Sequence, residues 1–171
     1  MNTLTDTPLE FHYGAATDLL ANSSLGVELT MEQCASLSSV VRVSCLKDGQ
    51  LLIAEQEVNE DIHVIIEGEL GVFKVTAGGD KTLLHTLKKG DMAGELGFID
   101  NTPHAASLYA NGMTTIYSIS RTDLESFIYT DSDIVYKVMR AITRTVHSIL
   151  RTMNNEYIEL LNYVTHQHGR Y

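Results

Sequence analysis

Residues 94–107 have the sequence Gly94-Glu95-Leu96-Gly97-Phe98-Ile99-Asp100-Asn101-Thr102-Pro103-His104-Ala105-Ala106-Ser107. This stretch is too polar and too rich in glycine to be a core strand. Pro103 fixes its own φ and favours an extended conformation at Thr102, so a turn is expected there. The small residues that follow let the backbone approach a neighbour closely. A short helical turn beginning at Glu95 would direct backbone N–H groups outward, and such a group of donors favours an anion.

The stretch resembles the phosphate-binding cassette of the cyclic nucleotide-binding domain family. That family includes the catabolite activator protein and the regulatory subunits of cyclic-nucleotide-dependent kinases. Its pattern is Gly-Glu-Leu-Gly/Ala, a short spacer, and then Arg-Ser/Thr/Ala-Ala. The residues that match in type and spacing are Gly94, Glu95, Leu96, Gly97, Pro103, Ala105 and Ala106. One position departs from the pattern, because the arginine that binds the cyclic phosphate in the family is His104 here.

The resemblance covers residues 25–164 and implies a mostly β fold with flanking helices. The expected core is a double-stranded β-helix (a jelly-roll-like β-roll) with a short N-terminal helix and a long C-terminal helix. The residue pattern agrees, because short apolar strands alternate with turn signals between Val40 and Ile119, which is typical of a sandwich or roll. We therefore predict an N-terminal arm (1–25), a β-roll (26–129) and a C-terminal dimerisation helix with its tail (130–171).

Several local signals refine this division. A capping residue followed three positions later by a polar residue predicts helix starts at Thr30-Gln33, Ser120-Asp123 and Thr130-Asp133. We expect a turn at Gly68 and a last strand over Thr114–Ile119. Residues 1–25 are weakly patterned, and their Leu19-Leu20 pair predicts no more than a packed arm followed by a loop.

The final helix is expected over Ser132–Val164, and apolar residues recur along it in steps of three and four. These residues are Met139, Ile142, Val146, Ile149, Met153, Tyr157, Leu160 and Val164. A helix of this length measures about 49 Å at about 1.5 Å per residue, whereas a roll of about 90 residues is about 25–30 Å across. Part of the helix must therefore project beyond the roll. We predict a homodimer through this helix; the alternative is an apolar stripe that packs entirely on its own domain.

Composition restricts the partners. The formal net charge is −10 and the chain has 12 Lys and Arg residues, which argues against a nucleic-acid partner because phosphate backbones are bound mainly by clustered basic residues. Too few residues follow the final helix for the winged helix-turn-helix that activator-type family members carry.

No apolar run approaches the ~20 residues of a membrane span, and no signal-peptide pattern is present, so we expect a cytoplasmic protein with no membrane partner. Cys34 and Cys45 have no metal-ligand spacing.

The resemblance also implies the site. Its ligand-binding residues would be Gly94, Glu95, Leu96, Gly97, His104, Ala105 and Ala106. Glu95 would accept the ribose 2′-hydroxyl, backbone N–H groups and His104 would face the cyclic phosphate, and the base would approach Val146, Ile149 and Leu150 on the final helix. We predict a non-catalytic regulatory sensor that binds cAMP or cGMP weakly and signals to an unidentified effector protein through the final helix. The alternative is a ligand-free roll that serves as a dimeric interaction scaffold, with Glu95 and His104 paired across the pocket.

An enzyme is the other class of function considered. Metal-dependent cupins share the double-stranded β-helix, and His63 followed by Glu67 weakly resembles part of a cupin ligand set, with His85 as a third candidate. The cupin pattern needs two histidines separated by one residue before the glutamate, and here that position is Val64-Ile65. We therefore expect no catalytic residues, no metal and no cofactor.

Overall fold

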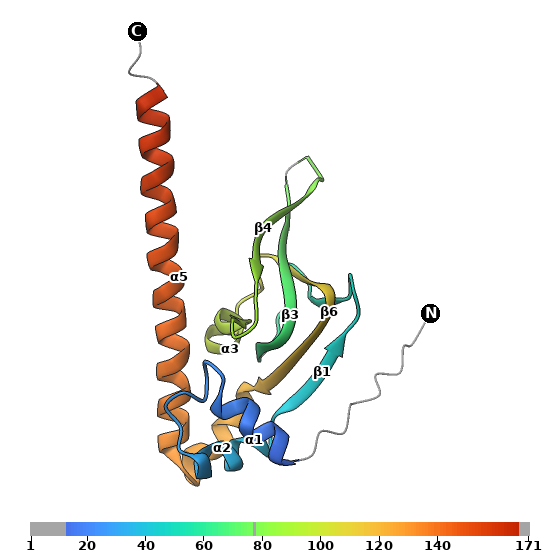
Figure 1. The fold of residues 1–171 in the computed structure, drawn as a ribbon, viewed down its shortest axis with the longest axis vertical. Coiled ribbons are helices and arrows are strands. Elements are labelled where there is room, and N and C mark those ends of the chain that lie inside the picture. The colour runs from blue at the N-terminus through green and yellow to red at the C-terminus, as the bar shows by residue number, and fades with distance from the viewer. Residues whose placement is uncertain (1–12, 77, 168–171) are drawn as a thin grey trace.

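The computed structural model describes residues 13–76 and 78–167 (Figure 1). Parts of the predicted arm (1–12) and of the C-terminal tail (168–171) lie outside the described residues. In chain order, the elements are α1 (Tyr13–Ala21), α2 (Met31–Ser38), β1 (Arg42–Leu46), β2 (Leu51–Ile53), β3 (Asp61–Val75), β4 (Lys81–Leu87), β5 (Met92–Ala93), α3 (Glu95–Asp100), β6 (Ser107–Ser120), α4 (Arg121–Glu125), the 3-10 turn η1 (Ser126–Tyr129) and α5 (Ser132–Gln167).

The described strands form one six-stranded antiparallel sheet. Its order is β1-β6-β3-β4, with β2 paired to β6 and β5 paired to β3. The two long strands β3 and β6 pair from Asp61↔Ser120 to Phe73↔Ser107. Short helices precede the sheet and a single long helix follows it (Figure 1). The predicted fold class, mostly β with flanking helices, is confirmed.

Two strand predictions were wrong in detail. Gly68 does not form a turn but a bulge inside the continuous strand β3, where the register against β6 shifts. Its φ of 85° is left-handed, and a Cβ there would lie 2.5 Å from the carbonyl oxygen of Met113, so glycine is needed. The last strand begins at Ser107 rather than Thr114, since the residues after the cassette already pair with β3.

The helix starts were mostly predicted correctly. At Thr30 the full capping box is present, and the Ser120 hydroxyl accepts the Asp123 N–H at 3.0 Å. Thr130 does not cap α5. That helix begins at Ser132, and the carboxylate of Asp131 accepts the N–H of Asp133 at 3.2 Å.

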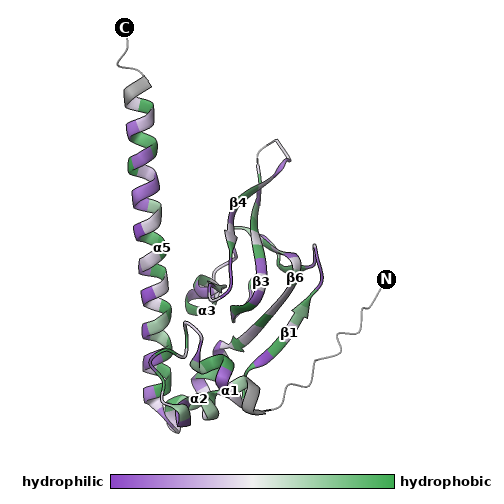
Figure 2. Ribbon diagram, in the orientation of Figure 1, coloured by the Kyte–Doolittle hydropathy of each residue, from purple (hydrophilic) through white to green (hydrophobic). Residues whose placement is uncertain are grey.

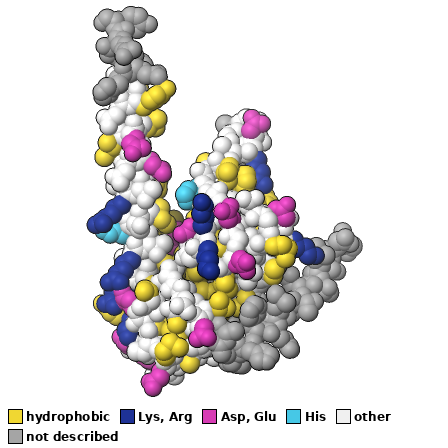
Figure 3. Space-filling model, viewed as in Figure 1, with side chains coloured by type: hydrophobic (Ala, Val, Ile, Leu, Met, Phe, Trp, Pro, Cys, Tyr) yellow, Lys and Arg dark blue, Asp and Glu magenta, His cyan; other side chains and the backbone are white. Residues whose placement is uncertain are grey.

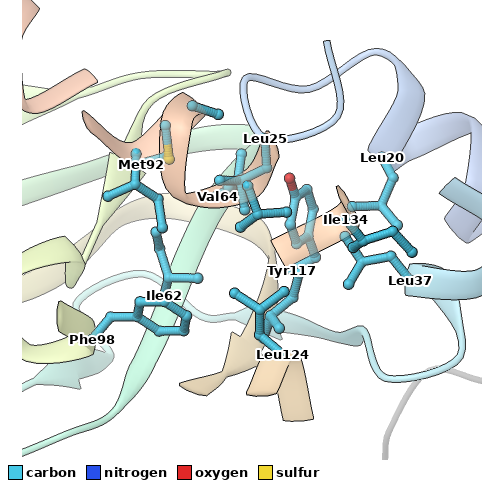
Figure 4. Packing of buried hydrophobic residues seen from close by; sticks show 14 of the residues in the cluster. Leu20, Leu25, Leu37, Ile62, Val64, Met92, Phe98, Tyr117, Leu124 and Ile134 are labelled. Atoms are coloured by element: carbon cyan, nitrogen blue, oxygen red, sulfur yellow. The ribbon is translucent and has the colours of Figure 1, made fainter. Parts of the chain in front are cut away.

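One apolar core joins the N-terminal helices, the sheet and the first turns of α5 (Figure 4). The predicted arm is helical from Tyr13 onward and includes Leu20. Leu20 is fully buried, as are Leu25, Ile134 and Ile142. The residues of the N-terminal segment therefore pack into the same core as the long helix. The division at residues 25/26 and 129/130 stays a prediction.

The long helix α5 projects beyond the roll, as predicted (Figure 1). Its first turns bury Ile134, Val138 and Ala141, whereas apolar residues beyond Val146 are exposed although they continue the same stripe (Figure 2). Among the helices of the described residues, none has the length together with the apolar character that crossing a bilayer requires.

Candidate ligand-binding site

The cassette is built as a tight turn against the first residues of β3. Gly94 has a left-handed φ of 87° and precedes the six-residue helix α3, so the helical turn predicted from Glu95 is present. A Cβ on Gly94 would lie 2.5 Å from the carbonyl oxygen of Asp61, and one on Gly97 would lie 2.6 Å from that of Asn59. Both glycines are needed because the cassette backbone touches the neighbouring backbone directly.

Glu95 is the acidic group of the site and is half-buried. Burial raises the pKa of its carboxyl, while a hydrogen bond from its own backbone N–H and the charge of His104 lower it. A carboxylate in this position is poorly solvated, so a hydroxyl donor from a ligand would form a strong bond with it.

His104 faces the cassette. Its backbone is fixed on both sides, because its N–H donates to the Glu57 carbonyl at 2.9 Å and its carbonyl accepts from the Gln56 N–H at 2.8 Å. The imidazole lies against Gly97, where a Cβ would come within 3.0 Å of Nε2. This Nε2 atom is buried and has no hydrogen-bond partner in the described part of the chain. Although both side chains are described, no ion pair joins His104 to Glu95, so the direct pairing considered from the sequence is not formed.

The other predicted site residues surround the same turn but contribute little side-chain chemistry. Leu96 is exposed and points away from the core, Ala105 is exposed and Ala106 is half-buried. On α5, Ile149 and Leu150 are also exposed. The cassette nevertheless shares a core with α5, because buried Phe98 of α3 belongs to the same cluster as Ile134 and Ile142 of α5; Figure 4 shows Phe98 and Ile134.

His63 is a buried residue of this region that the sequence suggested only as a metal ligand. It is 3% exposed, its Nδ1 lies 2.6 Å from the Ser118 hydroxyl, and its Nε2 is buried without a hydrogen-bond partner among the described residues. Its Cδ2 would be 3.5 Å from a Cβ on Gly94. Burial lowers the pKa of His63 to about 4, despite the opposing charge of Asp61.

The cupin-like metal set is not assembled. His63 is buried in the roll, whereas Glu67 and His85 are both exposed. Within residues 13–76 and 78–167, no group of three or more His, Cys, Asp or Glu side chains could hold a metal ion.

Comparison with known proteins identifies the family. A family model described as "Cyclic nucleotide-binding domain" matches residues 43–131. The CRP-like cAMP-activated global transcriptional regulator of Mycobacterium tuberculosis is 24% identical over 144 residues, which are 84% of this chain and 62% of that protein. The cAMP-dependent protein kinase regulatory subunit of Mycosarcoma maydis is 30% identical over 86 residues, which are 50% of this chain and 16% of that protein. The chain thus spans less than two thirds of either relative.

A solved structure supports the fold. The crystal structure of a cyclic nucleotide-binding domain from Methylobacillus flagellatus superposes with a TM-score of 0.75 at 18% identity, covering 86% of this chain and 83% of that one. At this identity the similarity establishes the shared β-roll architecture.

Proposed function

Because this chain belongs to the cyclic nucleotide-binding domain family, we propose that it is a non-catalytic regulatory sensor that binds a cyclic nucleotide weakly. The observation that carries the proposal is the cassette itself. A left-handed Gly94 leads into α3, Glu95 is half-buried beside it, and the imidazole of His104 faces the turn. Glu95 would accept a ribose hydroxyl, and the backbone N–H groups of the first helical turn would face the cyclic phosphate.

Weak binding follows from the histidine. Arginine offers a charged planar group that makes two parallel hydrogen bonds to a phosphate, whereas histidine offers one donor in a given direction and is largely neutral at pH 7. Removing one partner of a buried charge pair costs about 2–5 kcal/mol, or about 30- to 4000-fold in affinity. A cyclic nucleotide site with a dissociation constant of about 1 μM would then have one between about 30 μM and 4 mM.

Signalling would pass from the cassette to α5. Phe98 of α3 and Ile142 of α5 are buried in one cluster, so a movement of the cassette changes the packing of the helix. The projecting half of α5 carries exposed apolar side chains, visible in yellow in Figure 3. We propose that this half forms a homodimer and presents the signal to an effector protein, in the cytoplasm.

A thermal-shift screen of cyclic mono- and dinucleotides tests the sensor directly, since a ligand that binds only the folded state raises its melting temperature. Calorimetry with cAMP and cGMP at pH 6 and pH 8 then tests the role of His104. A bound phosphate favours the protonated imidazole, so the affinity is expected to be higher at pH 6. Equal affinities at the two pH values would contradict a contact between His104 and the phosphate.

Restoring the family residue provides the second test. His104→Arg is expected to tighten cyclic nucleotide binding at least tenfold. If this variant folds and gains nothing, the pocket is closed for another reason.

The second candidate function is a ligand-free scaffold that docks through α5. The observation in its favour is the imidazole of His104, which lies within 3.0 Å of a Cβ position on Gly97 and occupies space beside the cassette. A scaffold predicts the same exposed helix but no change in melting temperature with any nucleotide, including in His104→Arg.

A further inference from the structure

His63 faces the inside of the roll, on the side of the cassette. Successive residues of a strand point to opposite faces. Ile62 and Val64 belong to the core cluster shared with the helices, whereas Ile65 belongs to the cluster enclosed by β1, β3 and β6. His63, next to Ile62 and in register with Ser118 and Ala93, therefore points inward, with its ring below Gly94.

The hydrogen bond to Ser118 indicates which nitrogen carries the proton. If Nδ1 donated to the serine oxygen, both the buried serine O–H and the Nε2 lone pair would lack a partner among the described residues. If instead the serine O–H donates to Nδ1, only one group, the Nε2–H, is left without a partner. The second arrangement leaves fewer buried polar groups unsatisfied, so we assign the Nε2–H tautomer from the hydrogen-bond network.

A buried N–H without an acceptor is costly, and the Nε2–H of His63 is such a group. The Nε2 atoms of His63 and His104 are each buried without a partner in the described part of the chain, and the rings lie beside Gly94 and Gly97 respectively. The two histidines also influence each other electrostatically. An acceptor oxygen placed between the cassette and β3 would satisfy the Nε2–H of His63, and the Nε2 of His104 would be a second donor in the tautomer or protonation state in which it carries a proton.

We propose that His63 is a second ligand-binding residue, which donates its Nε2–H to an exocyclic oxygen of the phosphate diester that the cassette binds. His104 would contact the other exocyclic oxygen, so that two imidazoles on different elements replace one guanidinium. This inference rests on the proposed function, because it names a further contact in the same site. Both nitrogens are inaccessible to solvent, so binding requires the cassette turn to separate slightly from β3.

The two histidines would contribute differently. His63 stays neutral at physiological pH, since burial lowers its pKa to about 4, and a neutral imidazole already carries the required donor. The charged and titratable groups that act on it are Asp61, Arg42 and His104, and Glu95 interacts with His104. The His63 contact is therefore insensitive to pH between 6 and 8.

Ligand titration by NMR, which measures millimolar dissociation constants, tests the proposal with cAMP as the probe. His63→Phe keeps a ring of similar size but has no donor, and is expected to weaken binding about three- to tenfold, the value of one neutral hydrogen bond. His63→Gln, whose amide nitrogen can take the place of Nε2, is expected to retain most of the affinity. His85→Phe changes an exposed histidine on β4 and should leave the affinity unchanged.

The variant His104→Arg distinguishes a failure of the proposed His63 contact from a failure of the proposed function. If it binds cAMP while wild type and His63→Phe bind equally, the contact to His63 is wrong and the proposed function stands. If neither wild type nor His104→Arg binds, both proposals fail. A second measurement does not depend on a variant that folds: the imidazole nitrogens of His63 in wild type should show the Nε2–H tautomer by long-range ¹H–¹⁵N correlation. An Nδ1–H tautomer would overturn the inference.

Discussion

The two halves of α5 have the same apolar periodicity but opposite surroundings. In the first half, Ile134, Val138 and Ile142 are fully buried against the roll and the N-terminal helices. In the second half, Leu160 and Val164 continue the pattern of three and four residues but are about half exposed, at 59% and 47%. The helix is continuous through both halves (Figure 1). The stripe therefore specifies a helix, whereas its burial depends on where the roll ends.

The two halves of α5 also differ in their polar contacts. In the buried half, Arg140 and Arg144 both form ion pairs with Glu28, which precedes α2 and whose side chain is 12% exposed. Gln33 of α2 also accepts a hydrogen bond from Lys137 at 2.9 Å. These contacts tie the first half of α5 to the N-terminal segment. Charged residues of the second half, such as Glu156, are exposed.

The largest expected effect comes from deleting a side chain in the buried half. Ile142→Ala should reduce the free energy of unfolding by about 2–5 kcal/mol, because it removes buried methyl groups and leaves a cavity. Urea unfolding followed by circular dichroism measures this loss. A loss below about 1 kcal/mol would mean that the first half of α5 is not anchored in the core.

Acid should destabilise the roll on which the first half of α5 packs, without acting directly on the projecting half. An unfolded histidine takes up a proton near pH 6.5, but folded His63 resists protonation to about pH 4. Its contribution is therefore complete above pH 6.5 and is lost as the pH falls from 6.5 to 4. The difference between the two pKa values corresponds to a loss of about 3 kcal/mol. Urea unfolding at pH 7, 5 and 4 measures the loss, and hydrogen exchange should show reduced protection in β3 and β6 around His63 and Ser118, which are hydrogen-bonded. The profile should be flatter in His63→Gln.

Removing the ion pairs should have a smaller effect. Glu28→Gln is expected to cost about 1–2 kcal/mol, because the carboxylate is nearly buried but Arg140 and Arg144 are partly solvated. Glu156→Gln in the projecting half is the matched control and should stay within about 0.5 kcal/mol. Equal effects of the two changes would remove the distinction between the halves. Thermal unfolding at low and high salt provides the measurement.

The smallest effect on folding is expected at Leu160. Leu160→Ala should change the free energy of unfolding of the monomer by no more than about 0.5 kcal/mol, since the side chain is 59% exposed. If the projecting half forms the proposed homodimer, Leu160→Glu should nevertheless shift sedimentation toward monomer at a protein concentration where wild type is dimeric. An unchanged sedimentation profile for a dimeric wild type would place the interface elsewhere.

The cassette shows which structural features can be predicted from the local sequence. The helix starting at Glu95 depends on neighbouring residues and was predicted correctly. The requirement for glycine at positions 94 and 97 was not predicted, because it comes from the carbonyl oxygens of Asp61 and Asn59, which are distant in sequence. The contact of His104 with Gly97 fits its position in the family pattern. The hydrogen bond between His63 and Ser118 was missed, because these residues are 55 positions apart and meet only through the register of β3 and β6.

The sequence by itself determined the fold class, the cassette and the existence of a long helix, since each follows from periodicity, turn chemistry or a local motif. Contacts in the folded chain set three further features: Gly68 forms a bulge, His63 lies under the cassette, and the first half of α5 is the half that is covered. Strand register and burial depend on contacts between distant segments, whereas the local pattern is compatible with more than one arrangement.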